Sequence, residues 1–222
     1  MAATVLVIAP HMDDEVLGCG GVIARHVDQG DDVKVCVVCN RAYDRGYDSD
    51  AIQIEKASTR EAQKILGYSH LYHLDLPDEQ LYSHLQEVLE AIEKIVKEVT
   101  PDTVYTCHSG DLHQDHRTVA HASNIALRAI AAPYASRVLA YEVHSSTEQT
   151  FPGLAEGFRP NVFVDIAEQL ERKLAAIAAY ERESRAFPHP RSEEMLRAWA
   201  HARGTQCGRS AAEAFIMLRE TL

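Results

Sequence analysis

The chain has 222 residues, 46% of them hydrophobic and 25% charged, an ordinary balance for a globular protein with one sizeable core. Its 33 acidic and 22 basic side chains give a formal net charge of -11, which repels nucleic-acid backbones and anionic membranes. No apolar run reaches transmembrane length, so we expect neither a nucleic acid nor a membrane as a partner. No linker or repeat divides the sequence, and we expect a single domain over residues 1–222.

Strands and helices are expected to alternate along the chain. In order they are a strand at 4–9, a helix at 16–29, a strand at 33–39, a helix at 51–66, a strand at 71–76, a helix at 79–99, a strand at 102–107, a helix at 114–131, strands at 138–143 and 161–165, and a helix at 166–183. This alternation is typical of an open, mostly parallel α/β sheet, in which ligands bind beyond the carboxyl ends of the strands.

The cysteines bear on the cellular compartment. Five cysteines are an odd number, and the segment after Met1 lacks the basic region of a secretory signal peptide. We therefore expect a cytoplasmic location with free thiols. Cys36 and Cys39 have the spacing of a redox or zinc pair, but strand alternation turns them to opposite faces, which favours packing.

Polar residues follow three of the predicted strands. His11, Asp13 and Asp14 come after the first strand, Asp78 after the third, and the segment 111–116 after the fourth. Because the carboxyl ends of parallel strands meet at one edge of a sheet, we expect these groups to converge. Histidine and carboxylate side chains are the usual ligands of a catalytic zinc. The sequence therefore predicts a metal-dependent hydrolase.

The roles of the individual residues follow from zinc chemistry. A catalytic zinc takes three protein ligands, which His11, Asp14 and His116 would supply, and leaves one position open. The ion would lower the pKa of water to about 7 and polarise a carbonyl oxygen. Asp13 would then serve as the general base that takes the proton of the water. His113 would stabilise the oxyanion or donate a proton.

Asp115 would orient one of these histidines from outside the ligand set. Structural roles are alternatives for the same residues. Either aspartate after the first strand could cap the next helix, and His113 and His116 could be solvated residues of a first helical turn. Asp78 could belong to an ordinary turn.

Both polar groups lie in segments that resemble a known family. Pro10-His11-Met12-Asp13-Asp14-Glu15 and Asp111-x-His113-x-Asp115-His116 resemble the two signatures of the PIG-L/LmbE-like zinc deacetylases. Segments 60–67, 76–78 and 163–180 are also similar to this family, and 188–192, 203–204 and 212–215 to the branch with bacillithiol-pathway deacetylases. Met12 and Gln114 stand where the family usually has proline.

The resemblance implies a Rossmann-like fold with helices on both faces of the sheet, and removal of the acetyl group from an N-acetylglucosamine-type sugar or conjugate. It implies the same three metal ligands, Asp13 as the base, His113 as the electrophilic or acid partner and Asp115 as its tuner. Arg60 and Asp78 would hold sugar hydroxyls.

Arg191 would line the mouth of the substrate cleft, or it would only form part of a proline-rich turn. For Arg60 the alternative is a place on the solvated face of a helix. The expected cofactor is Zn²⁺, and the ligand set also accepts Fe²⁺, Co²⁺ or Mn²⁺. The family often forms closed assemblies, so we expect a homo-oligomer. Two other functions stay open: a metal-dependent amidase acting on a non-sugar N-acyl substrate, and a non-catalytic metal- or sugar-binding module.

Overall fold

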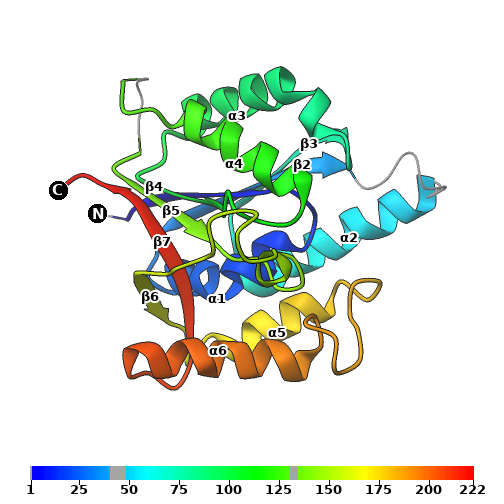
Figure 1. The fold of residues 1–222 in the computed structure, drawn as a ribbon, viewed down its shortest axis with the longest axis vertical. Coiled ribbons are helices and arrows are strands. Elements are labelled where there is room, and N and C mark those ends of the chain that lie inside the picture. Colours follow the sequence, from blue (N-terminus) through cyan, green and yellow to red (C-terminus); the bar gives the residue numbers. More distant parts are fainter. Residues whose placement is uncertain (1, 41–48, 131–134) are drawn as a thin grey trace.

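The computed structural model describes residues 2–40, 49–130 and 135–222 (Figure 1). This part of the chain contains a seven-stranded sheet in the order β3-β2-β1-β4-β5-β7-β6. The strands are β1 (Thr4–Ala9), β2 (Asp32–Asn40), β3 (His70–Pro77), β4 (Thr103–Cys107), β5 (Arg137–Tyr141), β6 (Val162–Asp165) and β7 (Ala212–Glu220). All pairs from β3 to β5 are parallel, and β7 is antiparallel to both of its neighbours.

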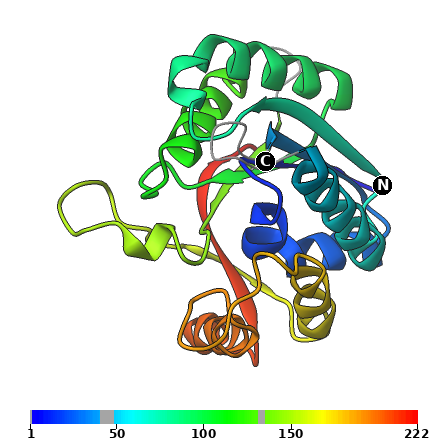
Figure 2. The ribbon, with the colours of Figure 1, turned by 90° about the vertical axis from the view of Figure 1, so that its right-hand side faces the viewer.

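Helices cover both faces of the sheet. One face carries α3 (Leu85–Val99) and α4 (Gln114–Ala126), and the other carries α1 (Asp14–Asp28), α2 (Ser49–Leu66), α5 (Leu170–Ala178) and α6 (Glu193–Cys207), as Figures 1 and 2 show. This double cover explains why residues 5–9 of β1 are all apolar and buried, since neither of their faces meets water. The predicted open, mostly parallel sheet with helices on both faces is confirmed.

The order of the strands determines where the site lies. Strand β1 pairs with β2 on one side and with β4 on the other. From β1 the chain adds β2 and β3 toward one edge of the sheet and then β4 and β5 toward the other edge, so the direction of strand addition reverses beside β1. In open α/β sheets the crevice for a ligand forms at such a reversal, beyond the carboxyl ends of the strands. The segments that follow β1 and β4 meet there.

The predicted helix at 79–99 is wrong at its start. A short 3₁₀ turn at Leu81–Ser83 precedes α3, which begins at Leu85. The backbone N–H groups of Glu79 and Leu81 donate to the Asp115 carboxylate, at 2.6 and 3.1 Å. Both residues lie just after β3. The chain therefore forms a loop around the buried Asp115 carboxylate where the first turn of the predicted helix would be.

The two last elements were missed by the sequence analysis. Ser192 caps α6, with its hydroxyl oxygen accepting the Met195 N–H at 3.2 Å. Strand β7 begins Ala-Glu-Ala-Phe, and Glu213 is buried in it although a charge at this position is atypical of a strand interior. Among the described residues, no helix combines the length and apolar character that crossing a membrane requires.

Glu213 is buried against helix α1. Its carboxylate accepts the N–H groups of Gly21 and Val22, at 2.8 and 2.7 Å, in the middle of that helix. Lys173 of α5 donates to the Leu17 carbonyl at 2.8 Å and to Glu213 at 2.6 Å. The ion pair therefore satisfies backbone groups of α1 and ties this helix to α5 and β7.

Candidate metal centre

The turn between β1 and α1 brings two candidate ligands together. Asp13 precedes the helix with a φ of 111°, a left-handed conformation that is rare outside glycine. Its backbone N–H donates to Glu15 Oε2 at 3.1 Å, which holds the turn from the buried side. The His11 N–H donates to Asp14 Oδ2 at 2.9 Å. The imidazole of His11 and the carboxylate of Asp14 therefore share one side of the turn.

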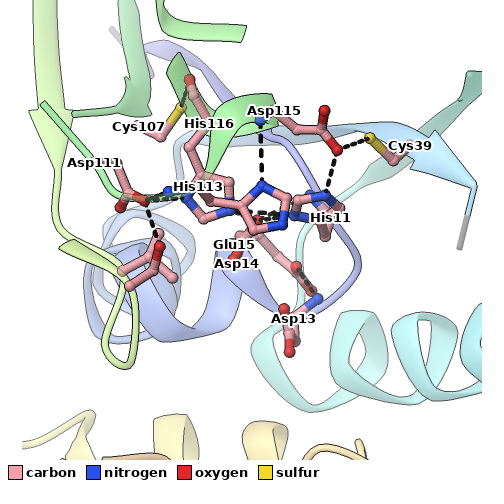
Figure 3. Close-up of polar contacts among 12 residues, drawn as sticks. His11, Asp13, Asp14, Glu15, Cys39, Cys107, Asp111, His113, Asp115 and His116 are labelled. Atoms are coloured by element: carbon pink, nitrogen blue, oxygen red, sulfur yellow. Dashed lines mark hydrogen bonds and ion pairs between the residues drawn. The ribbon is translucent and has the colours of Figure 1, made fainter. Parts of the chain in front are cut away.

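The segment after β4 is held in a similar way. Asp111 Oδ1 accepts the His113 N–H at 2.8 Å, and Asp111 Oδ2 accepts the Thr147 hydroxyl at 2.5 Å. His113 is the N-cap of α4, and its Nδ1 accepts the Asp115 N–H at 3.2 Å. His116 then lies one turn into the helix, buried and directed toward His11 (Figure 3).

The three predicted metal ligands converge. His11 Nδ1 lies 3.1 Å from His116 Nε2, and both atoms lie 3.2 Å from Asp14 Oδ2. Zinc–ligand bonds of about 2.0–2.1 Å in a tetrahedron place neighbouring ligand atoms about 3.3 Å apart. The three atoms therefore already have the mutual spacing of a zinc ligand set.

A buried oxygen supports the same fit. Asp14 is 1% exposed, and its Oδ1 has no hydrogen-bond partner within the described ranges. An unsatisfied buried carboxylate oxygen costs free energy that a bound cation would recover. The residues present therefore fit a divalent metal.

Carboxylates outside the three ligands orient both imidazoles. His11 Nε2 lies 3.0 Å from Asp78 Oδ1 and 3.2 Å from Asp115 Oδ2. His116 Nδ1 lies 3.2 Å from Asp111 Oδ1, in an ion-pair contact without good hydrogen-bond alignment. Such contacts fix the ring that binds a metal and raise its basicity. Asp115 thus contacts His11 through its side chain, and His113 only through its backbone.

Two other groups of ligand atoms also lie close together. In each of them all atoms fall within 4.8 Å of one another: His11, His113 and His116 form one group, and His11, Cys39, Asp78 and Asp115 the other. In the second group, however, the Asp115 carboxylate already accepts two backbone N–H groups. In the first, His113 Nδ1 is engaged as the helix cap.

The charges in the site shift the pKa values in opposite directions. Burial alone would lower the pKa of His116, but Asp14 and Asp111 outweigh burial and raise it to about 9. Burial would raise the pKa of Asp14, but His116 and His11 hold it well below its usual range. Burial and the charges of His11 and His116 lower the pKa of His113 to about 4. Of the three histidines, His113 is therefore the one whose pKa is lowered.

A cavity of about 360 Å³ opens beside these residues, large enough for a small ligand. His11, Asp13, His113 and His116 line it together with Asp78, Glu79, Leu112, Ser145, Ser146, Glu183, Arg185, His189 and Arg191. The structure thus brings Asp78 and Arg191 to the cavity. It places Arg60 on the exposed side of α2, outside the cavity lining.

Similarity to known proteins identifies the family. A family model described as "PIG-L: GlcNAc-PI de-N-acetylase" matches residues 6–127, more than half of the chain. The chain belongs to the PIG-L family. This PIG-L protein is accordingly a hydrolase that acts on the carbon–nitrogen bond of an amide.

Three relatives illustrate the likeness. The uncharacterized deacetylase YaiS of Escherichia coli is 33% identical over 78% of this chain and 88% of its own length. A probable N-acetyl-alpha-D-glucosaminyl L-malate deacetylase 2 of Bacillus cereus is 28% identical over 84% of this chain and 86% of its own. The solved N,N'-diacetylchitobiose deacetylase of Pyrococcus horikoshii has a TM-score of 0.76 and 26% identity, covering 97% of this chain and 84% of its own.

The structure adds residues to the site of this PIG-L protein that the sequence analysis did not assign. Asp111 contacts His116, and Glu15 accepts the Asp13 N–H. Tyr180, just after α5, donates to Glu15 Oε1 at 2.5 Å. Glu15 directly follows Asp13 and Asp14, so its place in the acidic run after β1 was a sequence signal for a role in the site. Tyr180 is distant in sequence, and only the resemblance of the segment 163–180 pointed to it.

Proposed function

We propose that this PIG-L protein is a zinc-dependent deacetylase of an N-acetylglucosamine-type sugar or conjugate. The observation that carries the proposal is the convergence of His11 Nδ1, Asp14 Oδ2 and His116 Nε2 beside Asp13 in the cavity. The Bacillus cereus relative is named for a glucosaminyl malate and the Pyrococcus horikoshii relative for diacetylchitobiose. These names support an N-acetylglucosamine-type substrate.

In this proposal His11, Asp14 and His116 hold the metal. Zinc, when bound, supplies a Lewis acid that makes water a stronger nucleophile near neutral pH and polarises the acetyl carbonyl. Two imidazoles and one carboxylate are a usual ligand set for catalytic zinc, and Fe²⁺, Co²⁺ or Mn²⁺ can take the same set. Asp115 and Asp78 orient His11, and Asp111 orients His116.

Asp13 is the proposed general base. It lines the cavity next to the ligands and is 1% exposed, so little water competes for its carboxylate. It takes the proton of the attacking water as the water oxygen bonds to the acetyl carbon. The carbon–nitrogen bond then breaks, the proton passes to the leaving nitrogen, and acetate and a free amine are released.

His113 is the proposed oxyanion donor. Its Nδ1 accepts the Asp115 N–H, so the proton of the neutral ring resides on Nε2. A pKa lowered to about 4 keeps the ring neutral at pH 7. A neutral Nε2–H can donate to the carbonyl oxygen as its negative charge develops, which favours the donor role over the cation role.

Substrate contacts, compartment and assembly remain predictions. Asp78 lines the cavity and Arg60 does not, so contact with a sugar at Arg60 would require a substrate that extends beyond the cavity. A cytoplasmic location agrees with five cysteines that are all free. A homo-oligomer remains an expectation from the family resemblance.

Metal analysis and an acetate-release screen on one preparation test the proposal. The screen includes N-acetylglucosamine, its oligomers, malate- and inositol-linked forms and non-sugar N-acetyl amides. We expect about one zinc per chain, acetate release from a sugar substrate, and loss of release with a chelator. Asp13→Ala should keep the zinc and lose at least 100-fold in turnover. Wild-type turnover in that variant would refute the base, and release from non-sugar amides alone would refute the substrate class.

A further inference from the structure

Arg191 reaches the proposed base from the far end of the chain. Its Nη1 donates to Asp13 Oδ2 at 2.7 Å and to Glu183 Oε2 at 2.7 Å. The Arg191 side chain is 17% exposed and that of Asp13 1%, so the ion pair is largely shielded from water. An ion pair in this setting holds its geometry better than one on the surface.

Arg191 is itself fixed by its surroundings. Its Nε donates to Ser145 Oγ at 2.8 Å, and its backbone N–H donates to His189 Nδ1 at 3.1 Å. The contacts to Ser145 and Glu183 tie the guanidinium to segments that follow β5 and α5, and the His189 contact holds the backbone. A planar guanidinium held at two of its nitrogens can present its remaining N–H groups in only one direction.

We propose that Arg191 is a positioning residue for Asp13, and that it sets the direction of the Asp13 carboxylate instead of contacting substrate. This inference rests on the proposed function, because it assigns a task to a partner of the proposed base. The Asp13 backbone is already fixed by the Glu15 contact to its N–H. A contact to the backbone N–H does not determine the side-chain torsions, and the ion pair with Arg191 restrains them.

The kinetics of Arg191→Gln separate positioning from substrate binding. A misdirected base slows the chemical step, so we expect kcat to fall about 10- to 100-fold while KM stays within about twofold of wild type. Zinc affinity should also stay within about twofold, because the side-chain contacts described for Arg191 go to Asp13, Glu183 and Ser145, which are not proposed ligands. A rise of tenfold or more in KM with unchanged kcat would show that Arg191 binds substrate, and would overturn the inference.

A double-variant cycle makes the test sharper. If Arg191 acts through Asp13, Arg191→Gln should cost less than about twofold in an Asp13→Asn background. The same 10- to 100-fold loss in both backgrounds would overturn the inference. Arg182→Gln is the matched control, since Arg182 is exposed in the turn after α5 and does not line the cavity. It should behave as wild type.

A crystal structure of zinc-loaded Arg191→Gln provides a readout that does not depend on activity. We expect the Asp13 carboxylate to leave its wild-type direction, and an unchanged direction would refute positioning. If Arg191→Gln does not fold, Ser145→Ala tests the same point by removing a contact to the guanidinium, with a smaller fall in kcat and the same KM. If the wild-type protein releases no acetate from any substrate, the proposed function fails. Crystal structures of the wild type and of Arg191→Gln still show whether the Asp13 carboxylate changes direction.

Discussion

His11 Nδ1 lies 3.1 Å from His116 Nε2, although 105 positions separate the two residues in the chain. At this distance only one proton fits between the two nitrogens, so one ring must donate and the other accept. Asp14 Oδ2 lies 3.2 Å from both atoms. The three ligand atoms therefore face a common point, at which a proton and a metal ion would compete.

Zinc binding should release at least one proton at pH 7. The pKa of His116 is raised to about 9 and that of His11 also lies above its ordinary value, so the metal-free pair carries a proton that the metal must displace. Titration calorimetry in buffers of different ionisation enthalpy measures the number released. Affinity should also weaken as the pH falls from 8 to 6. Zinc uptake without proton release would show that the pair carries no proton at pH 7.

Asp111→Asn should weaken zinc binding by about 10- to 100-fold. The reason is that Asp111 Oδ1 lies 3.2 Å from His116 Nδ1, and an amide orients and polarises that ring less than a carboxylate does. Competition with a chromophoric chelator gives the zinc affinity. Asp31→Asn is the control, because Asp31 contacts His26 at 2.7 Å in another histidine–carboxylate pair, away from the site. Equal affinities in the two variants would show that Asp111 does not act on the metal.

The centre of the site could be predicted because it depends on topology. An apolar run that stops at His11 predicts the end of β1, and the same pattern before Asp111 predicts the end of β4. The carboxyl ends of these parallel neighbours then bring the two segments together.

The partners of these residues could not be predicted in the same way. Asp115 was expected to orient one of the histidines, but the sequence did not show that its carboxylate would contact His11 and also accept N–H groups of the loop after β3. Arg191 lies 178 positions from Asp13, and their contact depends on how α5, α6 and the loop after β5 pack. No local pattern encodes such packing. Resemblance singled out the segment 188–192, but not what its arginine contacts.

Glu15→Gln should make the stability of the metal-free protein less dependent on pH. Burial raises the pKa of Glu15 from an ordinary value of 4.5 to about 8. The folded state therefore binds more protons than the unfolded state between these values, and stability falls as the pH rises through this window. A neutral glutamine removes this contribution, which amounts to at most about 1.4 kcal/mol per pH unit.

Urea unfolding of both proteins at pH 5, 6, 7 and 8 measures the difference. Other ionisable groups contribute equally to wild type and variant, so they cancel in the comparison. Glu61→Gln is the control, because its side chain is 53% exposed. Parallel stability curves for wild type and Glu15→Gln would mean that Glu15 is already ionised in the folded protein at pH 5.

Lys173→Met should destabilise the protein by roughly 3–5 kcal/mol, since it leaves Glu213 buried without its cation. The side chains of Lys173 and Glu213 are 4% and 5% exposed, and Lys173 also satisfies the Leu17 carbonyl inside α1. Lys64→Met removes the partner of Glu61 from a pair whose side chains are 73% and 53% exposed, and should cost less than about 1 kcal/mol. Urea unfolding compares the two. Equal costs would mean that packing, and not the ion pair, holds Glu213 against α1.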